Sequence, residues 1–211
     1  MKKILLAITL LTFGFSNAQV SFKPGVKAGF VSSTITSYGA DYRNNFYLGA
    51  YGTLQLGKVY NMQFEMLYIR QGAENISSVT TNYNAPNYPT VVRTVDVPLD
   101  YLSLNLINKF NFDKFNLQIG PGLDIKVSEE KIPTYPQGGG VLYDVNVYSI
   151  NNDVDLTLNI GLGYNFTDQL GIEARMRQGL IEPIYVNGES YYGSSSHLNR
   201  SFMVGLTYTF K

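Results

Sequence analysis

Apolar and polar residues alternate along most of this chain. In residues 201–211 every second residue is a large apolar or aromatic one, namely Phe202, Val204, Leu206, Tyr208 and Phe210. The residues between them are small or polar, apart from Met203. A period of two is typical of a β-strand that is apolar on one face only. Seven earlier segments share this period, at residues 22–33, 46–56, 62–72, 101–110, 115–127, 153–166 and 170–179. The pattern therefore predicts eight strands, each long enough to cross a membrane when tilted.

The alternation falters in the third segment, at Leu67, Ile69 and Arg70. A β-bulge inserts one extra residue into a strand and shifts the following side chains to the opposite face. We therefore predict a bulge here, which would return Arg70 to the polar face.

The predicted connections alternate between short and long. Residues 57–61, 111–114 and 167–169 are tight turns, whereas residues 34–45, 73–100, 128–152 and 180–199 are long. Short periplasmic turns and long external loops are the pattern of outer-membrane barrels. The chain is therefore predicted to be an all-β, eight-stranded antiparallel up-and-down transmembrane β-barrel with short periplasmic turns and four long extracellular loops.

Two of the external segments keep the strand period, at residues 91–97 and 143–150. They predict strand extensions that rise above the membrane as a ribbon. An unpaired ribbon edge could accept a strand from a partner. The alternative, which we favour because exposed edges are usually covered, is that these hairpins pair with one another.

A soluble sandwich or barrel is the alternative architecture for eight alternating strands. In that fold the apolar face would point inward and the polar face would meet water. Here the polar face carries many glycines among its charges, while the other face is almost continuously Leu, Ile, Val, Phe and Tyr. A lipid-facing exterior explains this distribution better.

Residues 1–18 have the layout of a secretion signal. Lys2 and Lys3 precede a short apolar core, and cleavage is expected between Ala18 and Gln19. A retained helical anchor is the alternative, but the apolar core is shorter than the roughly 20 residues that a membrane helix needs. We therefore predict a signal peptide at residues 1–18 and one outer-membrane β-barrel domain at residues 19–211, located in the outer membrane of a diderm bacterium.

Composition narrows the function classes. Removing Lys2 and Lys3 with the signal leaves 14 basic against 16 acidic side chains, which does not favour nucleic acid as a partner. The chain has no Cys, so it can form no disulfide, thiol nucleophile or thiolate metal site. It has no Trp either, so an interfacial aromatic girdle must consist of Tyr and Phe.

Four segments carry a family resemblance. Residues 101–110, 120–124, 159–166 and 173–180 resemble the fourth to seventh strand motifs of the PorT-like outer-membrane β-barrel family, a porin-like small barrel domain. The resemblance covers nearly all of the mature chain. Two positions depart from the family pattern: Asn105, where a proline is frequent, and Lys211, which follows the terminal aromatic residue. The resemblance implies the shared barrel, and a role in a secretion system does not transfer with it.

The polar strand faces carry both signs of charge. The residues predicted to face the barrel interior are Lys23, Lys27, Glu65, Lys109, Asp124, Lys126, Asp155, Glu173, Arg175 and Arg177. The interior of an eight-stranded barrel is just wide enough for side chains to fill it, and buried charges must be paired. We therefore predict an internal salt-bridge network that plugs the barrel. A narrow, gated channel for small solutes or ions is the alternative.

Evidence for catalysis is thin. His197, the only histidine, lies in the last predicted loop beside Ser195, and Glu189 could orient it in a hydrolase. A serine-rich loop with one histidine is also ordinary loop composition. One His, no Cys and dispersed carboxylates argue against a metal site, and no cofactor motif is present.

The predicted function is therefore that of a non-enzymatic outer-membrane barrel, structural, active in surface interactions, or accessory to a cell-envelope complex. The expected partners are outer-membrane lipid and the barrel-assembly machinery, which would read the C-terminal signal at Tyr208 and Phe210. The long loops, rich in Tyr and Asn, could also contact an extracellular or envelope protein. The chain is expected to be a monomer.

Overall fold

A computed structural model describes residues 21–36, 40–81, 90–128, 134–136, 144–146, 148–186 and 197–211. The predicted signal peptide, with its cleavage site at Ala18 and Gln19, lies outside these residues. So do most of the Tyr and Asn residues of the predicted loops. The described residues include no helix that could cross a membrane.

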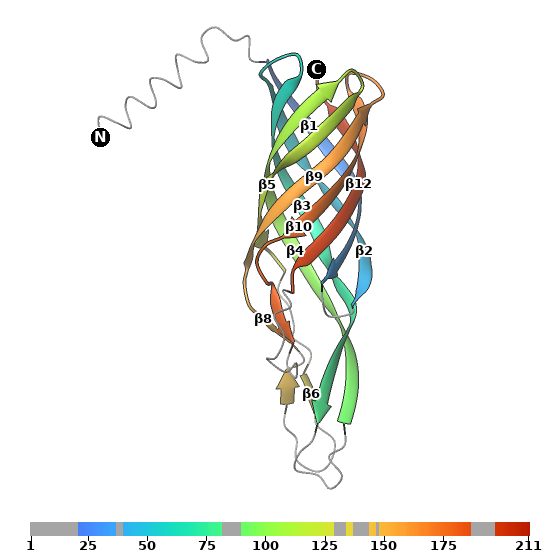
Figure 1. Cartoon of the computed structure of the whole chain (residues 1–211), viewed down its shortest axis with the longest axis vertical. Helices are drawn as coiled ribbons and strands as arrows, with labels where there is room; N and C mark the ends of the chain where they lie inside the picture. The colour runs from blue at the N-terminus through green and yellow to red at the C-terminus, as the bar shows by residue number, and fades with distance from the viewer. Residues whose placement is uncertain are drawn as a thin grey trace, which may run out of the picture.

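Within the described residues, eight long strands close into one antiparallel barrel (Figure 1). They are β1 (Ser21–Ile35), β2 (Asp41–Gln55), β3 (Tyr60–Thr81), β4 (Thr90–Phe112), β5 (Phe115–Lys126), β9 (Val154–Asn165), β10 (Leu170–Gly179) and β12 (Asn199–Thr209). Each strand pairs with the next of these along the chain, and β12 returns to pair with β1. This is the predicted up-and-down barrel.

The alternation along each strand sorts side chains between lipid and lumen. In β12, Phe202, Val204 and Leu206 are 44%, 50% and 55% exposed, whereas Ser201 and Met203 are buried. The other barrel strands show the same in–out pattern. Exposed Leu, Ile, Val and Phe side chains on a barrel exterior are stable in lipid and would be costly in water. The predicted lipid-facing surface is therefore the outer surface of this barrel.

The bulge predicted at residues 67–70 is wrong. The register of β3 with β4 is continuous from Tyr60↔Phe110 to Ala73↔Val97, and it shifts only between Ala73 and Ile76. Leu67 and Ile69 are fully buried in the lumen, and Arg70 points outward. The Nε of Arg70 lies 3.3 Å from Oδ2 of Asp100. The strand keeps its phase because this part of the lumen is itself apolar.

The first two long loops are shorter than predicted. β2 begins at Asp41, and β3 and β4 continue as a hairpin to the pair Thr81↔Thr90. This hairpin projects well beyond the barrel at the end opposite the C-terminus (Figure 1). Residues 91–97 therefore extend β4, as predicted, but they pair with β3; the pairing of the two hairpins with one another, which we favoured, is wrong. Residues 143–150 differ: they include β7 (Asp144–Asn146) and β8 (Tyr148–Ile150), which pair with β6 (Thr134–Pro136) and β11 (Ile184–Val186) in two separate small sheets.

Apolar side chains fill the extracellular part of the lumen. One cluster comprises Val31, Tyr47, Leu67, Ile69 and Met203. A second, which we call the apolar cap, comprises Ile35, Ala73, Ile76, Val95, Val97, Leu99, Tyr101 and Ile184. The cap joins the base of the β3–β4 hairpin to β1 and β11 at the extracellular end of the barrel.

The lipid-facing surface generates a depth-dependent prediction. Ile160 lies at the middle of β9 and is 55% exposed. Ile160→Arg should lower the free energy of unfolding of the barrel in lipid vesicles by about 2–4 kcal/mol, because a guanidinium at the bilayer midplane is poorly solvated. Phe166→Arg, just beyond the periplasmic end of β9, is the control and should cost about 0–1 kcal/mol. Equal losses, measured by equilibrium denaturation in vesicles, would contradict a lipid-facing surface.

Candidate functional site

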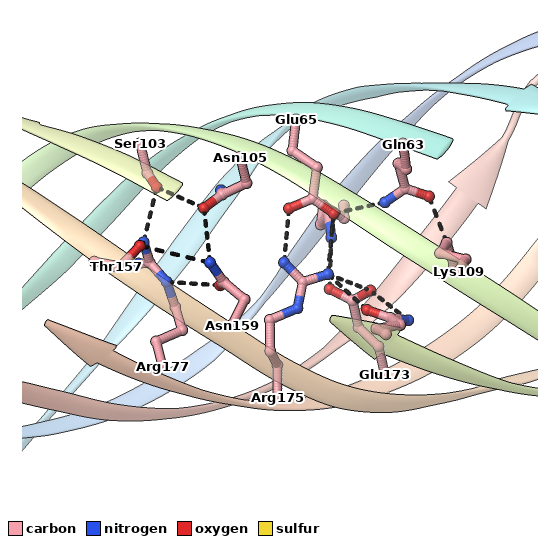
Figure 2. A network of polar contacts seen from close by, with 12 residues as sticks. Gln63, Glu65, Ser103, Asn105, Lys109, Thr157, Asn159, Glu173, Arg175 and Arg177 are labelled. Carbon is pink, nitrogen blue, oxygen red and sulfur yellow. Dashed lines mark hydrogen bonds and ion pairs between the residues drawn. The ribbon is translucent and has the colours of Figure 1, made fainter. Parts of the chain in front are cut away.

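Four charged side chains meet at the centre of the lumen. Lys27 comes from β1, Glu65 from β3, and Glu173 and Arg175 from β10. The period of two directs all four inward, and each is less than 5% exposed. Barrel closure brings together residues that lie far apart in the chain, and Figure 2 shows Glu65, Glu173 and Arg175 pointing toward one another.

Glu65 is the acceptor at the centre of this arrangement. Its Oε1 accepts hydrogen bonds from Lys27 Nζ at 2.7 Å, from Gln63 Nε2 at 2.6 Å and from Arg175 Nη2 at 3.0 Å. Its Oε2 accepts from Arg175 Nη1 at 2.7 Å. Arg175 therefore binds the carboxylate with two nitrogens, the strongest and most directional form of this ion pair.

Glu173 completes the central cluster. It accepts a hydrogen bond from Lys27 Nζ at 2.6 Å, and Arg175 Nη2 lies 3.4 Å from its other oxygen. Gln118 accepts from the same Arg175 nitrogen at 2.7 Å. Removing these charges from water is costly, and their attraction offsets that cost only because each ion has several partners.

A second layer lies toward the extracellular side. Arg177 Nη2 donates to Asp124 Oδ1 at 2.7 Å. It also donates to Ser103 Oγ at 2.9 Å, and the Nε of Arg177 donates to Asn159 Oδ1 at 3.0 Å (Figure 2). Asp155 lies opposite Asp124 across β5 and β9.

The carboxylate of Asp155 also shapes the chain that follows β10. Its Oδ1 accepts the backbone N–H groups of Leu180 at 3.1 Å and Ile181 at 3.0 Å. Asp155 therefore stabilises the turn toward β11. Asp153, which the alternation also places on the inner face, is exposed at the barrel rim instead, because β9 begins only at Val154.

The structure places three other predicted interior charges away from the central ion pairs. Lys109 Nζ donates to Gln63 Oε1 at 3.1 Å, on the periplasmic side of the cluster. Lys23 lies at the periplasmic mouth. Lys126 is half-buried at the extracellular end of β5. Both mouths of the barrel thus carry lysines, while the ion pairs occupy its middle.

Several neutral residues complete the network and were not among the predicted site residues. They are Gln63, Gln118, Ser103, Asn105, Thr157 and Asn159, all buried and hydrogen-bonded to charged residues or to one another. Each lies in the same strand phase as the charges. Their position on the inward face could therefore have identified them from the sequence. They were missed because the prediction included only ionised residues.

The remaining predicted sites lie outside the lumen. Tyr208 and Phe210 face outward at the periplasmic end, with ring centroids 5.5 Å apart. The backbone N–H of His197 donates to Glu182 Oε1 at 3.2 Å. Ser195 and Glu189 lie outside the described residues, so the proposed hydrolase dyad has no described geometry. Within the described part of the chain, no three His, Cys, Asp or Glu residues gather as a metal site.

The central cluster generates a prediction about stability. Glu65→Ala or Glu173→Ala leaves the buried Lys27 and Arg175 with too few acceptors, so each should cost about 3–5 kcal/mol. Asp168→Ala, in an exposed periplasmic turn, is the control and should change stability by less than about 0.5 kcal/mol. An unchanged urea-unfolding midpoint for both glutamate variants would show that the network does not hold the barrel together.

The match to a protein family agrees with this architecture. Residues 10–185 match the model of the outer membrane protein beta-barrel domain family. No curated protein matches the chain.

Three solved structures illustrate the similarity. Neisserial surface protein A is 16% identical with a TM-score of 0.49, covering 90% of this chain and 99% of that one. Ail, the attachment invasion locus protein of Yersinia pestis, is 12% identical with a TM-score of 0.47, covering 89% and 98%. OprG from Pseudomonas aeruginosa is 13% identical with a TM-score of 0.44, covering 92% and 98%. The family match spans most of the chain, and this protein therefore belongs to the outer membrane protein beta-barrel domain family and resides in the bacterial outer membrane.

Proposed function

We propose that this protein is a closed, non-enzymatic barrel that acts through its extracellular surface. The observation that carries the proposal is the filled lumen. Ion pairs and amides occupy its middle, and the apolar cap occupies its extracellular mouth. An eight-stranded barrel leaves little interior space beyond its side chains. A filled lumen argues against transport of solutes through the barrel and favours a role for its extracellular surface.

The β3–β4 hairpin is the part of the described chain best placed for such contacts. Its pairing continues to Thr81↔Thr90, beyond the last barrel pairs of β4 with β5 at Tyr101↔Lys126. Ile76 and Val95 anchor its base in the apolar cap. A rigid base with a projecting tip can present one surface to an extracellular or envelope protein, and we propose that class of partner.

Two further proposals concern assembly and relationship. The outward Tyr208 and Phe210 would be read by the barrel-assembly machinery, after which the barrel meets outer-membrane lipid as a monomer. We also propose that the chain belongs among PorT-like barrels. Its four matching motifs lie on consecutive barrel strands, β4, β5, β9 and β10, which supports this finer relationship.

The closed lumen predicts an absence of conductance. In planar bilayers the purified barrel should give no reproducible single-channel steps, because ions would have to displace the Lys27–Glu65–Arg175 ion pairs and then cross the apolar cap. A 16-stranded porin in the same bilayers is the positive control, since its lumen holds an aqueous channel. Regular steps that scale with protein concentration would favour the channel alternative.

The surface role predicts that the tip of the hairpin can be removed without loss of the barrel. Ser77 and Thr94 are register partners, so an Asn-Gly turn can join them in place of residues 78–93 and still retain Ile76 and Val95. The shortened barrel should unfold at the same urea midpoint as the full chain but lose its co-purifying outer-membrane partner.

A second variant keeps the length of the hairpin but changes its sequence, because residues 82–89 are replaced with Gly and Ser. It tests whether partner binding depends on the residues of the tip or on the length of the hairpin. If both variants keep the same co-purifying proteins as the full chain, the hairpin tip is not the contact surface.

A further inference from the structure

The periplasmic end of the lumen is open to solvent. A cavity of about 770 Å³ lies between the three periplasmic turns. A narrower recess of about 100 Å³ shares Lys23, Asn61 and Asn111 with this cavity and is also lined by Gln63 and Lys109. The cavity therefore leads inward from the periplasm and ends at the edge of the central ion-pair cluster.

Lys109 brings an unbalanced positive charge to this recess. The two central carboxylates, Glu65 and Glu173, bind Lys27 and Arg175. Counting Lys109, three cations share two carboxylates. Among the described residues, Lys109 Nζ donates only to the neutral Gln63 Oε1, and no carboxylate lies within 4.0 Å of it. An ammonium in this setting is best stabilised by an anion from solution.

The positive charge of the cavity is concentrated in its recess. Four lysines line the cavity and its recess, Lys23, Lys58, Lys109 and Lys114, against Asp113 and Asp168. Lys58, Lys114 and the two aspartates lie in exposed turns, where their charges balance and water screens them. The surplus positive charge therefore comes from Lys23 and Lys109, and an anion that enters from the periplasm is attracted to the recess.

The neutral residues that line the cavity indicate the chemistry of the rest of the ligand, beyond its anionic group. Gln55, Asn61, Asn111 and Asn165 contribute amides, and Thr53 and Thr209 contribute hydroxyls in the recess. Side-chain amides both donate and accept hydrogen bonds, as the hydroxyl groups of a sugar require. The cavity volume is in the range of small-molecule sites.

We propose that the periplasmic mouth is a binding site for a small anionic sugar, one that carries a carboxylate or a phosphate. The anionic group contacts Lys109 and Lys23 in the recess, and the hydroxyl groups contact the amides of the wider cavity. The ligand cannot continue outward, because the ion-pair cluster and the apolar cap lie beyond Lys109. The mouth is therefore a terminal binding site on the periplasmic side of the membrane.

The test is calorimetric titration of the full barrel in a zwitterionic detergent. Glucuronate probes the carboxylate class, glucose 6-phosphate the phosphate class, and glucose the contribution of hydroxyl groups alone. Saturable binding of one or both anionic sugars, with none of glucose, is expected. Glucuronate alone would assign a carboxylate ligand, and glucose 6-phosphate alone a phosphate ligand.

Variants locate the site. Lys109→Gln should weaken binding by about 10-fold or more, because a charge-assisted hydrogen bond is lost, while Lys109→Arg should restore most of it. Lys211→Gln is the matched control, since it removes one periplasmic positive charge outside the cavity, and its affinity should equal that of the unmodified chain. Should Lys109→Gln fail to fold, judged by its urea midpoint, Lys23→Gln replaces it with the same expected loss.

Three results would overturn the proposal. The first is the absence of saturable binding for both anionic sugars. The second is binding of glucose as tight as that of glucuronate and glucose 6-phosphate. The third is an unchanged affinity in a folded Lys109→Gln or Lys23→Gln barrel.

Discussion

Closure of the sheet by β1 and β12 is the interaction on which the rest of this structure depends. In lipid an unpaired backbone edge has no water to bond, so a spanning sheet must close. The seam runs from Gly25↔Thr209 to Ile35↔Asn199 and includes the pair Gly29↔Gly205. A side chain at either glycine would collide with the ring of Tyr47. The two glycines therefore leave room for the Tyr47 ring against the inner face of the sheet. Closure therefore sets the backbone pairing and also the narrow lumen that the side chains must fill.

The narrow lumen explains why its charges form a network. A strand that faces lipid on one side must place its charged residues on the other, and inside a closed eight-stranded barrel that side holds little water. Lys27, Glu65 and Arg175 come from three different strands, and each has more than one partner of opposite charge or matching polarity. Buried ion pairs contribute little net stability compared with a well-packed apolar core, but loss of one partner is costly. The network thus makes the barrel sensitive to single substitutions more than it makes it exceptionally stable.

The period of two predicted the barrel strands because lipid outside and packing inside impose opposite demands on neighbouring residues. It failed where both faces are apolar: Leu67 and Ile69 face an apolar lumen, so their hydrophobicity carries no information about which side they occupy. The outward Arg70 is explained by Asp100 and by the ring of Phe46, 5.8 Å from its guanidinium carbon, contacts that only the folded register supplies. Inward charges were predictable from phase, but their pairing was not. Lys27 is 38 residues from Glu65 and 146 from Glu173, and only closure brings them together.

The two ends of the lumen stabilise their charged side chains in different ways. On the extracellular side Arg177 binds Asp124, and the carboxylate of Asp155 accepts the backbone N–H groups of Leu180 and Ile181. These donors are fixed by the fold, so that end can lie beneath the apolar cap. On the periplasmic side the described residues offer Lys109 only the neutral Gln63 as a hydrogen-bond acceptor, and a cavity open to solvent adjoins it. Charged groups at a covered end need hydrogen-bond partners from the protein itself, whereas charged groups at an open end can bind ions or molecules from solution. The periplasmic mouth is therefore the part of the lumen that soluble molecules can reach, whereas the hairpin at the extracellular end is the surface that we propose for contact with another protein.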